Sequence, residues 1–449
     1  MVKAKSKKIT IEDALVPVEE QPYAIPENWC WTRIKYVSDV VTGSTPSKKN
    51  EEYYGGDFPF FKPADLDAGD NVVEASEYLS EEGKNVSRII PKLSTAVCCI
   101  GSIGKSGFLR VEGTTNQQIN SMIPKINPLY LYYYSKTNEF VTELWNKSTA
   151  TTISLVNKNN METNTIPLAP LAEQERIVEQ IENLFAKIDE AKEKAQDVLD
   201  GFEDRKSAIL FRAYSGELTA AWRKQNNISD ESWKRVRIQD VCKVNPPKIN
   251  AKEFDDDLEV SFFPMPALSE ITGTITDPQT RKLGEVKTGF TNFMEGDVVF
   301  AKITPCMENG KSAIIPPLVN DIGYGTTEFY VMRCSDKLLN GYLYHLVRSK
   351  HFRDEAKAVM TGAVGQQRVP KSFIEDYEIN LPLKEEQGVI LKIVDEMVQK
   401  ERVVADNCEK VIEQIELMKK SILAKAFRGE LGTNIKTEES AIELLKSIL

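Results

Sequence analysis

Two long segments of the chain carry apolar residues at alternating steps of four and three. The predicted seam positions are Ile177, Ile181, Leu184, Ile188, Val198, Phe202 and Ile209 in the first segment and Ile390, Val394, Met397, Val404, Val411, Ile415 and Ile422 in the second. This spacing is typical of a coiled coil, because one face of a lone globular helix drifts toward a longer period. Each segment is therefore predicted to be a helix that needs a partner helix.

The two segments are copies of each other. Glu173-Gln174 and Gly216-Glu217-Leu218 return as Glu386-Gln387 and Gly429-Glu430-Leu431, shifted by a constant 213 positions (387 − 174 and 429 − 216). The glycines after the last seam residues are typical of helix C-caps. Roughly 44 residues per copy predict rods of about 65 Å.

The order of the segments indicates how the rods pair. The first helix carries the chain from one globular segment to the next, so the second must run back if the two pack together. We therefore predict antiparallel helices related by an approximate two-fold axis. Arg205 and Glu401 are polar residues at seam positions and are expected to weaken the seam locally.

The globular segments that precede the helices are also related. Trp29 to Val37 matches Trp233 to Val241 in its Trp, Ile and final Val. Each segment then has a short apolar strand, a Gly-Lys-Ser sequence, a Thr-Thr pair that leads into a second strand, and an aromatic helix (130–145 and 342–352). We predict an α+β fold with two strand-rich α/β domains, each with its polar loops on one side.

These patterns divide the chain into six parts. The predicted parts are a flexible N-terminal arm (1–24), a first domain (25–169), a first helix (170–218), a second domain (219–381), a second helix (382–431) and a C-terminal tail (432–449). The arm carries Lys3, Lys5, Lys7 and Lys8 and is expected to be loosely ordered over residues 1–20.

Composition limits the possible partners. With 57 Lys and Arg against 67 Asp and Glu, the net charge of -10 does not by itself indicate nucleic-acid binding. The two domains are each close to neutral and the first helix is acidic, so an anionic ligand would have to meet local basic loops. Seven cysteines without a C-x-x-C pair, no signal peptide and no long apolar run indicate a cytoplasmic protein with reduced thiols.

Three motifs suggest catalysis or metal binding, but each lacks a necessary part. Gly104-Lys105-Ser106 resembles the end of a P-loop, yet Cys99 stands where the earlier glycine is required. Asn245-Pro246-Pro247-Lys248 resembles an adenine-binding motif of amino-methyltransferases, but Lys248 replaces the stacking aromatic. His345 and His351 are spaced wrongly for a shared metal ion. We therefore predict no catalytic and no metal-binding residues.

Polar loops in both domains instead offer groups that suit DNA. Hydroxyls and cations contact phosphates, while amides and guanidinium groups form paired hydrogen bonds with adenine and guanine edges. The candidate DNA-binding residues are Ser44, Thr45, Ser47, Lys48, Lys49, Lys105, Asn116, Gln117, Gln118, Lys248, Lys302, Lys311, Thr326, Thr327, Gln366, Gln367, Arg368 and Lys371. Lys105 and Lys311 hold equivalent positions and are expected to contact phosphates. Gln117, Gln118 and residues 366–368 are expected to approach bases.

The repeated motifs together resemble one known family. They comprise Pro170-Leu171-Ala172-Glu173-Gln174 and its copy Pro382 to Gln387 with one residue inserted, the Gly-Glu-Leu ends, the Trp-containing openings, and Asn116-Gln117-Gln118-Ile119-Asn120. In this combination they are similar to the specificity subunit of type I restriction-modification systems. The resemblance extends from about Ile25 to Leu431.

The resemblance implies a function and a set of partners. Each domain would read one half of an asymmetric, bipartite DNA target, while the helices set the spacing and dock two methyltransferase subunits. The subunit itself would be non-catalytic, with S-adenosylmethionine, ATP and Mg in the partner methyltransferase and restriction subunits. Two alternatives remain open: a two-headed coiled-coil scaffold that binds protein partners, and a stand-alone methyltransferase or fused restriction enzyme.

Overall fold

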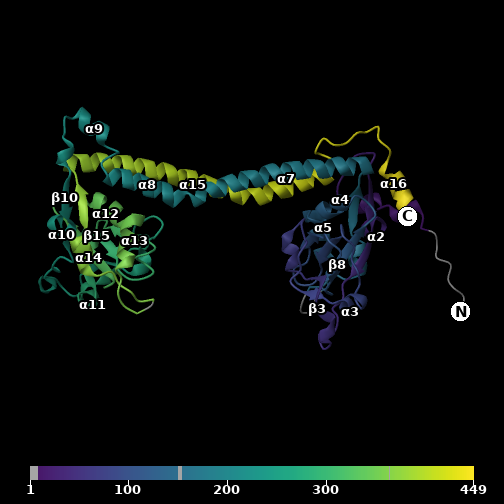
Figure 1. Cartoon of the computed structure of the whole chain (residues 1–449), viewed down its shortest axis with the longest axis horizontal. Coiled ribbons are helices and arrows are strands. Elements are labelled where there is room, and N and C mark those ends of the chain that lie inside the picture. The colour runs from purple at the N-terminus through teal and green to yellow at the C-terminus, as the bar shows by residue number, and fades with distance from the viewer. Residues whose placement is uncertain (1–8, 150–153, 364) are drawn as a thin grey trace. The chain divides into compact units, whose positions relative to one another are not determined.

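The chain forms two compact units, each of which combines one globular domain with part of the long helices (Figure 1). A computed structural model describes residues 9–149, 154–363 and 365–449. The first unit comprises residues 1–195 and 410–449, and the second comprises residues 196–409. The lysines predicted in the N-terminal arm, at positions 3, 5, 7 and 8, lie outside the described residues.

The first domain contains three small sheets, with strand orders β2-β8-β5-β6, β4-β3-β7 and β1-β9. Its strands are β1 (Cys30–Arg33), β2 (Ser38–Thr42), β3 (Tyr54–Phe61), β4 (Tyr78–Leu79), β5 (Thr95–Cys98), β6 (Ser106–Phe108), β7 (Thr114–Thr115), β8 (Ile119–Pro124) and β9 (Thr165–Leu168). Neighbouring strands are antiparallel except β3 and β7, which are parallel.

The second domain repeats this arrangement with one added strand, β14, in sheets β11-β18-β15-β16, β13-β12-β17-β14 and β10-β19. Its strands are β10 (Lys234–Arg237), β11 (Cys242–Val244), β12 (Glu259–Phe263), β13 (Gln279–Lys282), β14 (Thr291–Phe293), β15 (Val298–Ala301), β16 (Ser312–Ile314), β17 (Gly323–Gly325), β18 (Phe329–Cys334) and β19 (Glu378–Leu381). Strands β12 and β17 form the parallel pair. The predicted relation between the two domains therefore extends to their topology.

Each unit also contains short helices. They are α1 (Ile11–Ala14), α2 (Ile34–Val37), α3 (Glu81–Asn85), α4 (Pro128–Ser135), α5 (Asn138–Asn146) and α6 (Lys158–Glu162) in the first unit, and α9 (Ala220–Gln225), α10 (Ile238–Val241), α11 (Leu283–Val286), α12 (Asn340–Arg348), α13 (Lys350–Ala358) and α14 (Lys371–Asp376) in the second. Each predicted aromatic helix is thus two helices, α4 with α5 and α12 with α13. In each pair the second helix has a hydroxyl N-cap, Thr137 or Ser349.

The second long helix is continuous, whereas the first is interrupted. Helix α15 (Lys384–Phe427) has 44 residues, but the first copy divides into α7 (Leu171–Asp200) and α8 (Phe202–Tyr214) at Gly201. The predicted first rod is therefore present, but Gly201 interrupts its helix. Glycine is a poor helix former because its backbone loses most freedom on folding.

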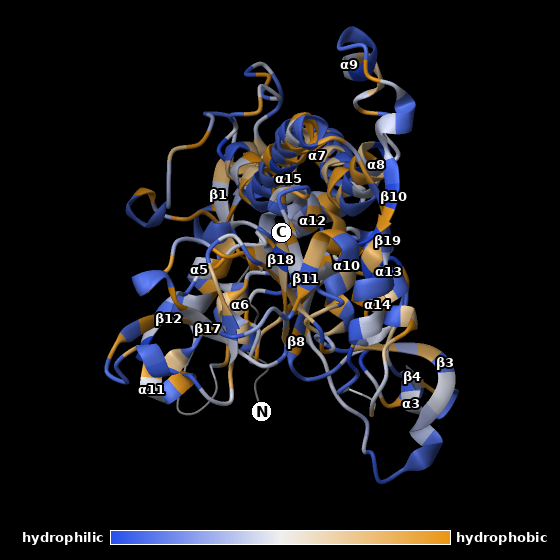
Figure 2. Ribbon diagram, turned by 90° about the vertical axis from the view of Figure 1, so that its left-hand side faces the viewer, coloured by the Kyte–Doolittle hydropathy of each residue, from blue (hydrophilic) through white to orange (hydrophobic). Residues whose placement is uncertain are grey.

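Within each unit the long helices pair in antiparallel fashion. In the first unit, Lys419 of α15 bonds to Asp189 of α7 at 2.6 Å. Nearer the domain, Ile177 and Ile181 of α7 share a core with Phe427. In the second unit, Arg205 of α8 bonds to Glu401 of α15 at 2.6 Å. Figure 2, which views these helices close to end-on, shows that they carry both hydrophobic and hydrophilic residues.

The seam is strongest near the two domains and weaker elsewhere. Ile209, Ile390, Val394 and Ile415 are buried, as are Ile177 and Ile181. Leu184, Ile188, Val198, Phe202, Met397 and Ile422 are partly buried. Val404 and Val411 are 45% and 42% exposed, so their prediction as seam residues was wrong.

Each domain core includes the end of a long helix. Phe427 is fully buried and its ring lies 4.9 Å from Tyr130 and 5.1 Å from Tyr134 of α4. Tyr214, 213 positions earlier (427 − 213), lies 4.8 Å from Tyr342 of α12. The helices therefore belong to the domain cores rather than merely connecting them.

The repeated Glu-Gln pair joins each helix start to its domain. Gln174 accepts from the backbone of Asn127, and Gln387 accepts from the backbone of Leu339. All four residues of the two pairs are fully buried. The motif therefore attaches each helix start to its domain, because a buried amide with satisfied hydrogen-bond partners fixes the direction in which the helix leaves the domain.

The segment after α15 returns to the first domain. Thr433 and Asn434 donate to the Glu173 carboxylate, and Arg176 forms a bidentate ion pair with Glu438. Helix α16 (Ala441–Ile448) buries Leu445 in the first domain's core. Residues 432–449 thus complete the first unit.

The N-terminal arm is partly ordered. Residues 11–14 form α1, which has a capping box at Thr10, and Val16 bonds to the backbone of Trp31. The arm was predicted to be loose over residues 1–20, whereas its described residues pack on the domain. None of the helices among the described residues is long and apolar enough to span a lipid bilayer.

Candidate nucleic-acid interface

Most of the candidate residues lie in loops that join one sheet of a domain to another. In the first domain, residues 43–53 lead from β2 to β3, and residues 116–118 lead from β7 to β8. In the second domain, residues 245–258 and 326–328 make the same two connections. A further loop in each domain follows β5 or β15 and ends at the predicted Gly-Lys-Ser sequence. The domains thus present equivalent loops to a ligand.

Amide and hydroxyl groups form a network in the first domain. The Thr45 hydroxyl bonds to the Gln117 side chain, and the Ser44 backbone N–H donates to Thr115 at 2.9 Å. The Asn116 amide donates to Gln118 Oε1 at 3.0 Å. The structure therefore brings the predicted residues of the two loops together.

A glycine allows these two loops to approach each other. A Cβ atom on Gly43 would lie 2.1 Å from the backbone oxygen of Asn116, a distance that real Cβ atoms do not reach. Next along the loop, Pro46 is held by the Tyr54 hydroxyl at 2.6 Å. Ser47, Lys48 and Lys49 follow it and are exposed. This loop is thus anchored at its start while its cations remain accessible.

An ion pair dominates the equivalent region of the second domain. Arg368 donates Nε and Nη2 to the two carboxylate oxygens of Glu328, both at 2.9 Å. Its Nη1 donates to the backbone oxygen of Gln366 at 3.0 Å. The hydrogen bonds from Arg368 lower the pKa of Glu328 below its ordinary value, although burial acts in the opposite direction. The carboxylate is therefore ionised at neutral pH.

Other candidates surround this ion pair. The Lys302 ammonium lies 5.2 Å from the centre of the Tyr330 ring, a cation–π distance. The Thr326 hydroxyl accepts from the Glu328 backbone at 3.2 Å. Gln366 and Thr327 are exposed, and Gln367 is partly buried. The second domain thus presents charges where the first presents amides.

The two lysines predicted to contact phosphates are both held within the protein. Lys105 forms an ion pair of 2.6 Å with Asp67, and Lys311 lies 3.4 Å from the backbone oxygen of Met265. The backbone oxygens of both lysines accept from the preceding strand, at Cys98 and Ala301, so their positions are equivalent. A phosphate at Lys105 would have to compete with the Asp67 carboxylate.

The remaining candidates are exposed side chains with local partners. Lys248 donates to the backbone oxygen of Phe290 at 2.7 Å, and Lys371 pairs with Glu375 one helical turn away. Asn245, which opens the Asn-Pro-Pro-Lys motif, accepts from the Val331 backbone at 3.1 Å. This asparagine therefore anchors a turn to strand β18.

Sequence reasoning missed one residue of this region. Glu328 follows the predicted Thr326-Thr327 pair directly but was not among the predicted residues. Its position just before β18, equivalent to Gln118 before β8, was a signal that could have found it.

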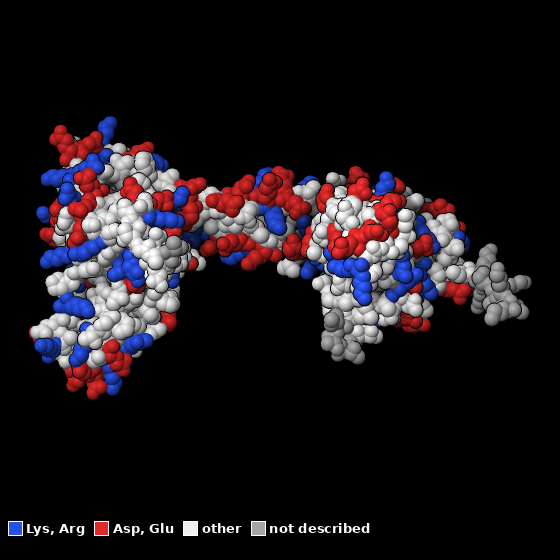
Figure 3. Space-filling view, turned by 60° about the horizontal axis from the view of Figure 1, so that its bottom comes forward, with Lys and Arg blue, Asp and Glu red and all other residues white. Residues whose placement is uncertain are grey.

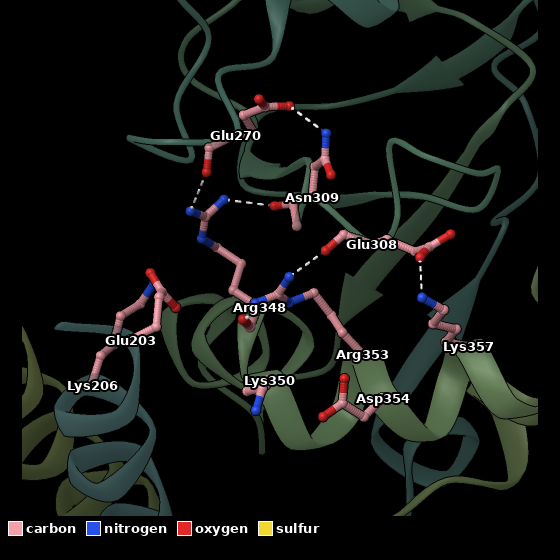
Figure 4. A pocket seen from close by; sticks show the side chains of 11 residues that line it. Glu203, Lys206, Glu270, Glu308, Asn309, Arg348, Lys350, Arg353, Asp354 and Lys357 are labelled. Carbon is pink, nitrogen blue, oxygen red and sulfur yellow. Dashed lines mark hydrogen bonds and ion pairs between the residues drawn. The ribbon is translucent and has the colours of Figure 1, made fainter. Parts of the chain in front are cut away.

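A charged pocket of about 400 Å³ lies elsewhere in the second unit, between α8, the β15–β16 loop and α13 (Figure 4). Arg348 is buried and donates to the backbone oxygens of Gly310 and Glu270, at 2.8 and 2.9 Å. Arg353 donates to the backbone oxygen of Glu308. These arginines hold the loop that ends at Lys311, so we interpret the pocket as support for the candidate interface.

Surface charge differs between helices and domains. In Figure 3, acidic side chains predominate on the long helices, whereas basic and acidic patches alternate on each domain. Any interaction with DNA would therefore depend on the local loops.

Among the described residues no group of three or more potential metal ligands occurs, and His345 is paired with Asp395 at 2.9 Å.

Comparison with known proteins identifies the family of these domains. The type I restriction modification DNA specificity domain matches residues 26–199 and 230–414. The EcoEI specificity subunit of Escherichia coli is 32% identical over 260 residues, which cover 49% of this chain and 43% of that subunit. The chain thus aligns with less than half the length of that relative. The StySPI specificity subunit of Salmonella potsdam is 20% identical over 92% of this chain and 91% of its own.

A solved structure shares the fold. The HsdS subunit from Thermoanaerobacter tengcongensis superposes with a TM-score of 0.62 at 18% identity, covering 92% of this chain and all of that one (100%). Both domains of the present chain fall within the matched family, as does most of each long helix. The chain belongs to the family of type I restriction modification DNA specificity domains.

Proposed function

We propose that this chain is the DNA sequence-specificity subunit of a cytoplasmic type I restriction-modification complex. The observation that carries the proposal is the pair of equivalent loop regions on two domains of one topology, with amides at one and an ion pair at the other. Each domain reads one half of a bipartite target. Because the side chains differ, the two half-sites differ.

The chain is a non-catalytic recognition subunit in this proposal. Its long helices set the spacing of the half-sites and dock two methyltransferase subunits, which bind S-adenosylmethionine and methylate adenine. Restriction subunits that use ATP and Mg join them in the full complex. The near-neutral charge of the two domains supports this division, because a subunit with few net positive charges gains little phosphate attraction alone.

Methylation mapping in the host tests the proposal. We expect a bipartite, asymmetric methylated-adenine motif that disappears when the gene is deleted and returns with the wild-type gene. Gln117→Ala together with Gln118→Ala should change or abolish one half of the motif only. The full chain should also co-purify with a methyltransferase subunit. A methylation pattern unaffected by the deletion would contradict the proposal and favour a protein-binding scaffold.

A further inference from the structure

The two domains hold their reading loops with the same backbone bonds. The Cys99 N–H donates to Gln118 at 2.7 Å, and the Lys302 N–H donates to Glu328 at 2.9 Å. In each domain a third loop binds to this pair of loops. The Val156 N–H donates to the backbone oxygen of Cys99, and the Val369 N–H donates to that of Lys302, both at 2.9 Å. Three loops are thus tied together in one way in both domains.

These bonds align individual positions between the domains. The residue before Val156 is Leu155, which bridges Ile100, and the residue before Val369 is Arg368, which bridges Ile303 in the same way. The equivalent pairs are Cys99 with Lys302, Gln118 with Glu328, and Leu155 with Arg368. In that order, the first domain has a thiol, an amide and an alkyl group. The second domain has an ammonium, a carboxylate and a guanidinium at the same positions.

The Arg368 guanidinium retains donors beyond those that the protein uses. An arginine side chain has five N–H donors. Glu328 takes one on Nε and one on Nη2, and Gln366 takes one on Nη1. One N–H on Nη1 and one on Nη2 therefore remain, and the Arg368 side chain is 43% exposed. Donors on these two adjacent nitrogens match the N7 and O6 acceptors of guanine in the major groove.

Glu328 fixes the direction of these free donors. A carboxylate that holds Nε and Nη2 together prevents rotation of the guanidinium about its long side chain. Glu328 is 25% exposed, and its backbone N–H donates to the Thr326 hydroxyl at 3.2 Å, which holds the residue in place. The arginine is thus preorganised rather than free to follow any nearby phosphate.

We propose that Arg368, oriented by Glu328, reads a guanine in the half-site of the second domain. This inference rests on the proposed function and adds the base and the residues. Arg368 touches the base, whereas Glu328 is a positioning residue that acts through it. The first domain has no counterpart at this position, since Leu155 has no polar group to offer a base edge.

Selection from a randomised duplex pool tests the assignment. The full chain, in complex with the methyltransferase subunit that co-purifies with it, would be used to select bound sequences. Wild-type complex should select a G·C pair at a fixed place in one half-site. Arg368→Leu, which introduces the residue of the first domain, should reduce preference for that pair about tenfold to a hundredfold and leave the other half-site unchanged.

Two further variants separate base reading from other roles. Arg368→Lys keeps the charge but loses the paired donors, so it should retain most of the affinity for mixed-sequence DNA and still lose preference for the G·C pair. Glu328→Gln should weaken the same preference without weakening binding to other sequences. A purely structural role for Glu328 would instead lower affinity for every sequence equally.

Arg235→Leu is the matched control. Arg235 lies in the same domain, forms a surface ion pair of 2.6 Å with Glu378, and is 74% exposed, so its loss should leave the selected motif unchanged. A wild-type complex that selects no bipartite sequence would contradict the proposed function. A complex that selects one, with a motif that Arg368→Leu leaves intact, would contradict the role of Arg368 alone.

Discussion

At the residue scale, the two equivalent lysines differ in how readily they can bind a DNA phosphate, because their partners within the chain differ. Lys105 is held by a carboxylate, whereas Lys311 faces only a backbone oxygen. Releasing Lys105 to a phosphate would leave Asp67 unpaired, while Lys311 has no such cost. We therefore expect Lys311 to contribute more to DNA binding than Lys105.

Salt dependence measures this difference. If Lys311 contacts a phosphate, Lys311→Ala should weaken binding to every sequence and reduce the slope of log affinity against log salt by about 1. Affinities of the methyltransferase complex at several salt concentrations would give the slope. Lys234→Ala, at an exposed lysine of β10 in the same domain, is the control. An unchanged slope for Lys311→Ala would show that this lysine does not contact phosphate.

The ion pair at Glu328 predicts a response to pH. Its hydrogen bonds from Arg368 lower the pKa of Glu328, so the pair contributes above the ordinary carboxyl pKa and is lost as pH falls through the lowered value. Preference for the G·C pair should therefore stay constant from pH 8 down to about 5, where ordinary glutamates remain ionised. Competition binding at fixed ionic strength would measure it. A preference that already declines between pH 7 and pH 6 would rule out this carboxylate as the controlling group.

Part of the candidate interface was predictable from the sequence. The polar clusters at 43–49, 116–118 and 366–368 were recognised from the sequence, and all three lie in connections between helices or strands. The Glu328–Arg368 bond joins residues forty positions apart, and only the tertiary arrangement of two loops brings them together. Single-sequence patterns carry no information on that pairing.

At the element scale, the long helices show where periodicity succeeds and where it fails. The apolar period located both helices, because packing against a partner requires an apolar stripe, and the glycines after the last seam residues marked their ends. It did not show the break at Gly201, where Arg205 donates to the backbone oxygen of Val198 at 2.8 Å and to Glu401. The two polar residues expected to weaken the seam are thus bonded to each other across it.

The buried end of α15 predicts a large stability effect. Phe427→Ala should destabilise the first unit by about 3–5 kcal/mol, because the cavity would lie between two tyrosines of the domain core. Phe211→Ala is a matched control, since Phe211 also lies near the end of a long helix but is 72% exposed. Denaturant unfolding of the full chain would compare them. Equal effects of the two substitutions would contradict the burial of Phe427.

At the scale of the whole molecule, charge predicts dependence on partners. The chain carries a net charge of -10, and its long helices are mainly acidic in Figure 3. Like charges on protein and DNA repel, so local loops alone supply attraction. We expect the isolated chain to bind its target weakly and the methyltransferase complex to bind it tightly in gel-shift titrations at the same salt. Tight specific binding by the isolated chain would contradict this expectation.

The return of residues 410–449 to the first unit has a consequence for synthesis. A ribosome makes the first domain before the second, yet the first domain's core includes Phe427 and Leu445, which are made after the second domain. The second unit is contiguous, at residues 196–409, and can fold earlier. The first unit, whose domain is made first, therefore completes its folding after the second unit. A premature stop before α16 would leave the first domain incomplete while the second was intact.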